Sequence, residues 1–157
     1  MAGVVDNRLQ ELRIELPLPA RAVGKYVGFV HTGNQVWSVQ GPLVGEDLAH
    51  QGRLGADFTL EQGQAAARQV LLNLLSQVRI ACDGDLDRVV RCVRLGGFVN
   101  STPEFKEHTA VMNGASDLIV EILGEAGRHT RFAVGCASLP YDLSVEIEGI
   151  FEVSSPK

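Results

Sequence analysis

Two long segments of the chain carry apolar residues at helical spacing. The first opens with a capping box at residues 59–62 and runs to about residue 80. The second covers residues 111–123, and upstream of it Thr102 is predicted as an N-cap with Pro103 at the first helical position. A short amphipathic helix is predicted within residues 4–14. The apolar stripes consist of Ala67, Val70, Leu71, Leu74 and Val78 in the first long helix and Ala115, Leu118, Ile119 and Ile122 in the second.

The remaining regular segments have the alternation or the β-branched composition of strands. Residues 26–31 and 35–39 are joined by Thr-Gly-Asn, which is a hairpin signal, and residues 86–99 predict one long central strand. Residues 129–153 alternate in two arms and predict two more strands. The order after the leading helix is therefore ββαβαββ, which favours an α+β fold with one layer of sheet under one layer of helices.

The two arms of residues 129–153 are predicted to form one β-hairpin. Residues 139–142, Leu-Pro-Tyr-Asp, supply the turn, because Pro restricts φ and Asp bonds its own backbone. On that register Arg131, Glu146 and Glu148 project from the same face of the sheet. The expected pairs are Ser138–Leu143, Gly135–Glu146, Ala133–Glu148 and Arg131–Ile150.

Between these charged residues the predicted hairpin carries only small side chains, at Ala133, Gly135 and Ala137. This floor of small residues is either a seat for side chains of another chain or a small pocket with charge at its ends. It is expected on the uncovered face of the sheet, and a single-sheet domain with such a face usually buries it by oligomerising.

Composition limits the classes of function. The chain has 157 residues, which predicts one domain, 1–157, and a formal net charge of −5 that argues against binding nucleic acid through phosphate neutralisation. No apolar run approaches the ~20 residues needed to span a bilayer, and the N-terminus lacks the apolar core of a signal peptide. We therefore expect a cytoplasmic protein without a membrane partner.

Neither cysteines nor histidines are spaced as metal ligands. Cys82, Cys92 and Cys136 are odd in number and contain no CxxC pair, so neither a disulfide framework nor a zinc site is predicted. The histidines show no i, i+4 spacing, and we expect no metal and no cofactor. His129 differs from the others because it lies two residues before Arg131, on the same face of the predicted strand.

Motifs at both ends of the chain resemble the Rid (YjgF) family, also called endoribonuclease L-PSP. Residues 131–140, RFAVGCASLP, followed by Val-Glu-Ile-Glu at 145–148, resemble the family's C-terminal signature of an arginine, a Leu-Pro turn and a Val-Glu-Ile-Glu strand. Gly24-Lys25-Tyr26, Thr32-Gly33-Asn34 and residues 38–42 are similar to its N-terminal pattern. The resemblance covers about residues 20–153, and residues 1–16 are expected to be an N-terminal helical extension.

The resemblance implies a chorismate-mutase-like fold, with a single mixed sheet and two long helices on one face, assembled as a homotrimer with clefts between subunits. Active family members hydrolyse reactive enamines and imines to a 2-oxo acid and ammonia without a cofactor. By this resemblance Arg131 binds the carboxylate of a small metabolite and Glu146 positions a water. Tyr26 and Asn113 line the cleft, and Ala133 occupies the substrate-binding position two residues after the arginine.

The chain also departs from the family pattern next to Arg131. The family has Pro-x-Arg followed by Ser or Thr, whereas here His129 and Phe132 stand at those positions, and Ala133 replaces a small polar residue or Cys. Three functions therefore stay open. They are an enamine/imine deaminase, a non-catalytic carboxylate-binding protein of the same fold, and a ribonuclease or translation inhibitor, which the acidic charge disfavours.

Overall fold

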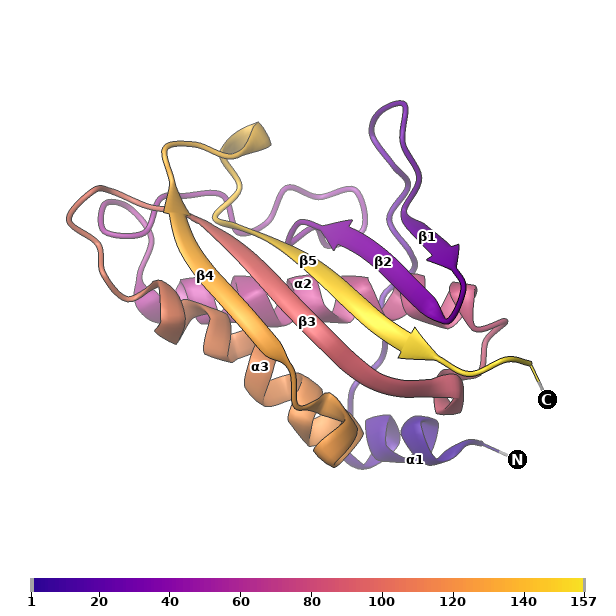
Figure 1. Cartoon of the computed structure of the whole chain (residues 1–157). Coiled ribbons are helices and arrows are strands. Elements are labelled where there is room, and N and C mark those ends of the chain that lie inside the picture. Colours follow the sequence, from indigo (N-terminus) through magenta and orange to yellow (C-terminus); the bar gives the residue numbers. More distant parts are fainter. Residues whose placement is uncertain (1, 157) are drawn as a thin grey trace.

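The computed structural model describes residues 2–156 (Figure 1). None of the helices in that part of the chain is both long and apolar enough to cross a membrane. In chain order the elements are α1 (Val4–Glu11), β1 (Phe29–Thr32), β2 (Gln35–Gln40), α2 (Leu60–Ala81), η1 (Leu86–Arg88), β3 (Val89–Asn100), α3 (His108–Leu123), η2 (Gly124–Gly127), β4 (Thr130–Cys136), η3 (Pro140–Asp142) and β5 (Val145–Val153).

One five-stranded sheet has the order β1-β2-β5-β3-β4, in which only the β3–β4 pair is parallel. The helix α2 packs on β2 and β5, and α3 packs on β3 and β4, so both long helices cover the same face (Figure 1). The predicted α+β architecture with a mixed sheet and a short N-terminal helix is therefore confirmed.

The predicted hairpin of residues 129–153 is wrong, because β3 lies between β4 and β5 (Figure 1). Arg131 pairs with Leu95 of β3, and Glu146 pairs with Phe98 of the same strand. The connection crosses the end of β3 instead of turning tightly, and the Asn100 amide donates to the Ser144 carbonyl at 2.9 Å. Alternation shows that a segment is a strand but not which strand becomes its neighbour.

Arg131 and Glu146 consequently project from opposite faces of the sheet. Leu95, beside Arg131, is fully buried under the helices, whereas Phe98, beside Glu146, is 42% exposed. Paired residues share a face and neighbours along a strand alternate, so these two positions differ. The prediction that the two charged side chains share a face is therefore wrong.

The floor of small residues also lies on the helix side rather than on the open face. Ala133 packs against the core, and a Cβ at Gly135 would lie 2.6 Å from the His108 ring and 2.7 Å from the Ser101 hydroxyl. Ala137 lies beyond the end of β4. The open face instead carries large apolar side chains that are 42–52% exposed, namely Val30, Trp37, Val39, Phe98 and Val134.

The start of α2 agrees with the sequence prediction, and that of α3 does not. The Thr59 side chain accepts from the Gln62 amide and completes the predicted capping box of α2. The helix α3 begins at His108 without a side-chain cap, so Thr102 is not its N-cap. The Thr102 amide donates to the Leu54 carbonyl at 3.0 Å, because the strand end at Ser101 forms a β-bridge with Leu54.

The helices α2 and α3 lie close together at Gly114. A Cβ there would overlap the backbone carbonyl oxygen of Gln64, which cannot rotate away. Gly97 plays a similar part beneath α3, because a Cβ there would overlap the Met112 thioether. The absence of a side chain at Gly97 and Gly114 therefore allows α3 to lie close to the sheet and to α2.

Replacement of Gly114 by Ala is expected to destabilise the protein. Alanine favours the helix by about 1 kcal/mol, but overpacking against fixed backbone costs about 3 kcal/mol. The free energy of unfolding in urea should therefore fall by about 2 kcal/mol. Asp117→Ala, on the exposed side of α3, is the control and should change it by no more than about 0.5 kcal/mol. An unchanged or higher stability of the Gly114 variant would contradict the close contact.

Candidate functional site

Arg131 lies on the edge strand β4 with its guanidinium against α3. Its Nη1 donates to the Asn113 side-chain oxygen at 2.9 Å and to the Ser116 hydroxyl at 3.0 Å. Its Nη2 donates to the backbone carbonyl of Thr109 at 3.3 Å. Asn113 and Ser116 are three residues apart and therefore lie on the same side of the helix.

These bonds use three of the five N–H donors of the Arg131 guanidinium. Within residues 2–156 the Nε–H and one Nη2–H have no protein acceptor. Nε and Nη2 are the neighbouring nitrogens on one edge of the guanidinium, and such an edge binds a carboxylate through two parallel hydrogen bonds. The residue is half-buried, which strengthens a charge-assisted bond relative to one in bulk water.

His129, the residue immediately before β4, joins this cluster. Its Nε2 lies 2.9 Å from the Ser116 hydroxyl, and its Nδ1 lies 2.6 Å from the Gly127 carbonyl oxygen. Gly124 ends α3 at a φ of 61°, which favours glycine, and the η2 turn then brings the chain back along the helix. This turn places residues 129 and 131 opposite α3.

Glu146 lies on β5, on the open face and beside Phe98. Burial raises the pKa of its carboxyl group. The Cys136 thiol lies near enough for mutual influence, because its pKa is raised by burial and, to a smaller extent, by the Glu146 charge. A carboxyl group with a raised pKa is a stronger base when ionised than an ordinary one.

Tyr26 lies far from Arg131, because it precedes β1 at the opposite edge of the sheet (Figure 1). Its side chain is 63% exposed, and its hydroxyl accepts from the Val23 amide at 3.4 Å. The predicted site residues thus occupy three places: Arg131, Asn113 and Ala133 between β4 and α3, Glu146 on the open face, and Tyr26 beside β1.

Sequence reasoning missed Ser116 and the pair formed by Ser101 and His108, whose Oγ and Nε2 atoms lie 3.0 Å apart. The helical spacing from Asn113 would have been the signal for Ser116. No spacing signals the Ser101–His108 pair, because it depends on how the loop before α3 folds onto β4. Gly135 leaves the space that this pair fills.

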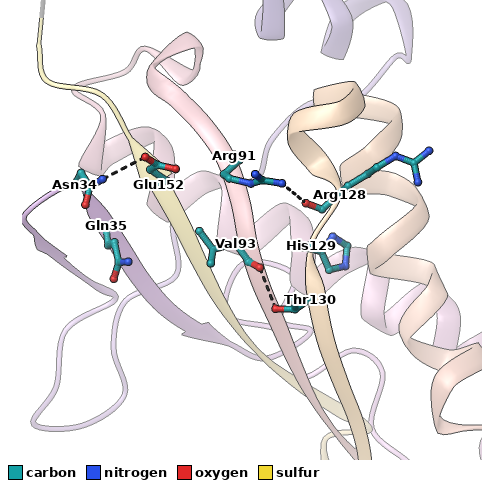
Figure 2. Close-up of a pocket in the computed structure, with 8 residues that line it drawn as sticks. All are labelled: Asn34, Gln35, Arg91, Val93, Arg128, His129, Thr130 and Glu152. Atoms are coloured by element: carbon teal, nitrogen blue, oxygen red, sulfur yellow. Dashed lines mark hydrogen bonds between the residues drawn. The ribbon is translucent and has the colours of Figure 1, made fainter.

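A pocket of about 630 Å³ lies at one end of the open face. Figure 2 shows two hydrogen bonds between residues that line it: Arg91 donates to the Arg128 carbonyl, and Asn34 donates to Glu152. Arg131 does not line this pocket. No group of three or more His, Cys, Asp or Glu side chains that could hold a metal occurs within residues 2–156. The pocket is lined by Asn34, Gln35, Arg91, Val93, Arg128, His129, Thr130 and Glu152.

A family model described as "YjgF/chorismate_mutase-like, putative endoribonuclease" matches residues 6–148. Protein TCP17 of Trypanosoma cruzi is 46% identical over 98% of this chain and 97% of its own length. The solved structure of Atu1372 from Agrobacterium tumefaciens, a protein of unknown function, is 43% identical, covers 96% of this chain and 93% of its own, and superposes with a TM-score of 0.89.

A third similar structure is E. coli TdcF with bound serine. It is 25% identical, covers 90% of this chain and 96% of its own, and has a TM-score of 0.61.

Replacement of Glu146 by Gln is expected to change how stability depends on pH. Because burial raises the pKa of Glu146 in the folded state, its ionised form is disfavoured there. The wild type therefore loses stability as the pH rises from the ordinary pKa of a glutamate carboxyl group through the raised pKa of Glu146. The Glu146→Gln variant has no carboxyl group at this position and does not lose this stability. Urea unfolding at about pH 4 and about pH 8 should give Glu146→Gln a stability advantage only at the higher pH.

Glu148→Gln is the matched control, because it removes the same charge from the same face of β5. An equal pH-dependent gain in both variants would show that overall charge, and not burial of Glu146, causes the effect.

Proposed function

Because the chain belongs to the YjgF/chorismate-mutase-like family, we propose that it hydrolyses small 2-imino and 2-enamino acids, without a cofactor, to 2-oxo acids and ammonia. The observation that carries this proposal is the Arg131 guanidinium, which α3 holds by three hydrogen bonds while its Nε–Nη2 edge has no protein acceptor within residues 2–156. That edge matches a carboxylate in shape and charge.

The proposed reaction is addition of water followed by loss of ammonia. Arg131 binds the substrate carboxylate, which places the adjacent imine carbon next to the attacking water. A 2-enamino acid first tautomerises to the imine, gaining a proton on its terminal carbon and losing one from nitrogen. The Glu146 carboxylate takes a proton from the water as the C–O bond forms and delivers it to the imine nitrogen, which gives a neutral carbinolamine. Glu146 then carries the hydroxyl proton to the amine nitrogen as the C–N bond breaks, so ammonia leaves, the 2-oxo acid forms and the carboxylate is regenerated.

Arg131 and Glu146 meet in this mechanism only if they come from different subunits, because within one chain they project from opposite faces of the sheet. We therefore place the reaction in a cleft between neighbouring subunits of a homotrimer. The exposed apolar side chains of the open face support association, since large unpartnered apolar faces usually mark interfaces. Tyr26, on the far edge of the sheet, is placed in the cleft by the same assembly.

The substrate class is a small metabolite with a carboxylate next to a nitrogen-bearing carbon. E. coli TdcF is named as binding serine, which has this arrangement, and its likeness to this chain supports a ligand of that kind. The net charge of −5 disfavours a ribonuclease or another nucleic-acid partner. A cytoplasmic location, without a membrane partner, agrees with the metabolic role.

Replacement of Arg131 by Ala is expected to lower kcat/KM for 2-iminopropionate about ten- to hundredfold, because a charge-assisted hydrogen bond contributes about 1.5–3 kcal/mol. Ammonia release from freshly generated imine measures the rate. Arg128→Ala removes an exposed arginine from the same region and is the control.

Equal rates for the wild type and the Arg131 variant would contradict the proposal. Binding of 2-oxo acids without turnover of any imine would favour the non-catalytic carboxylate-binding protein instead. RNA cleavage that co-purifies with the wild type and is lost in the Arg131 variant would favour the ribonuclease.

A mixture of Arg131→Ala and Glu146→Gln subunits is expected to recover activity. Each pure variant lacks one group in every cleft, and loss of a general base typically costs about 10²–10⁴ in rate. In a cyclic homotrimer that contains both variants, one cleft in about three has both groups restored. Co-expression with two affinity tags isolates the mixed oligomers for assay.

The two variants purified separately and combined at the time of assay are the control. Mixed oligomers no more active than this control would show that one chain supplies both residues, or that the clefts are not shared between subunits.

A further inference from the structure

The hydrogen bonds of His129 fix which ring nitrogen carries the proton. The Gly127 carbonyl oxygen can only accept, so the 2.6 Å contact requires a hydrogen on Nδ1. In the neutral ring Nε2 is then an acceptor, and the Ser116 hydroxyl donates to it at 2.9 Å. The lone pairs of the Ser116 oxygen remain for Arg131, whose Nη1 donates to it at 3.0 Å.

The four groups thus form one directed chain from Arg131 through Ser116 and His129 to the Gly127 carbonyl. The second hydrogen of Nη1 is donated to the Asn113 side-chain oxygen. Both Nη1 hydrogens are therefore engaged by α3, and the guanidinium cannot turn to present Nη1 to a ligand without breaking a bond. Nη2 also donates to the Thr109 carbonyl, so within residues 2–156 the Nε–H and one Nη2–H are the hydrogens left without a protein acceptor.

We propose that Ser116 and His129 are positioning residues that lock the guanidinium of Arg131 so that it binds a carboxylate through its Nε–Nη2 edge. The identity of the ligand, a 2-oxo or 2-imino acid, rests on the proposed function. The locking itself does not, because it follows from the hydrogen bonds within the chain. A site of this kind gains affinity by preorganisation, since the guanidinium loses less freedom when the carboxylate binds.

Two substitutions of His129 separate the positioning role from a purely structural one. His129→Gln places a side-chain oxygen near the position of Nε2, where it can accept from Ser116, but loses the Gly127 contact. His129→Asn reaches only the position of Nδ1, so it keeps the Gly127 contact and loses Ser116. Each variant loses one of the two bonds, so a structural role would predict similar losses of stability and no difference in ligand affinity.

Pyruvate affinity by calorimetry and steady-state turnover of 2-iminopropionate are the functional readouts. Ser116→Ala and His129→Asn should raise Kd and KM about tenfold, which corresponds to about 1.4 kcal/mol, with kcat within about twofold of wild type. His129→Gln and Ser116→Thr, which keep the acceptor and the hydroxyl, should stay within about twofold in Kd and KM.

Nitrogen-15 NMR of the ring and of the guanidinium tests the locking without any activity. The wild type should give the Nδ1-protonated neutral tautomer at His129, and separate Nη signals of Arg131 that indicate slow rotation about its Nε–Cζ bond. Those signals should persist in His129→Gln and average in Ser116→Ala and His129→Asn. An Nε2-protonated tautomer, or averaged signals in the wild type, would overturn the proposal.

The remaining outcomes separate the two proposals. Wild-type Kd and KM in Ser116→Ala, with affinity lost in Arg131→Ala, would overturn the positioning role and leave the proposed function standing. Absence of binding and turnover in the wild type would overturn the proposed function. The NMR signals would still show whether Ser116 and His129 lock the Arg131 guanidinium. If thermal melting shows that His129→Asn is unfolded, the comparison of Ser116→Ala with Ser116→Thr tests the positioning role by itself.

Discussion

The pairing of β3 with both β4 and β5 determines on which face of the sheet Arg131, Ala133 and Glu146 lie. Because β3 is parallel to β4 and antiparallel to β5, it separates two strands that are close in sequence. Its pairing turns Arg131 toward α3 and Glu146 toward the open face. A direct hairpin would have placed both charged groups on one face of one chain, where they could form an ion pair. The observed order keeps them apart and leaves each side chain for a different partner.

The small residues beneath α3 allow this helix to hold Arg131. Gly97 and Gly114 let the helix lie close to the sheet and to α2, so that Asn113 and Ser116 reach the guanidinium at 2.9–3.0 Å. A larger residue at Gly114 would meet the Gln64 backbone and displace the helix, and hydrogen bonds weaken steeply with distance and angle. The floor of small residues on β4 therefore serves the helix side of the sheet. In the sequence it resembled an empty pocket because composition does not indicate which face is covered.

Much of the fold could be predicted from local patterns, and the geometry of the site could not. The capping box at Thr59 and the period-2 alternation act over a few residues, so they identified α2 and the strands. Strand order depends on contacts between residues distant in sequence, and the Leu-Pro-Tyr-Asp turn does not encode it. The motif resemblance selected Arg131 and Asn113, which are hydrogen-bonded to each other. Ser116 carries no motif, and its role emerges only when α3 is placed on β4.

The opposite charges of Arg131 and Glu146 also bear on which molecules the proposed cleft selects. An imino acid carries a carboxylate and, when protonated, a positive nitrogen on the adjacent carbon. In the proposed trimer, with Arg131 from one subunit and Glu146 from the next, each charge of the ligand would meet its opposite. A 2-oxo acid such as pyruvate lacks the positive nitrogen and therefore keeps only the charge-assisted contact with Arg131. Because the two groups lie on opposite faces of one chain, they cannot form an ion pair within a subunit, and one ligand can contact both of them only where two subunits meet in the proposed cleft.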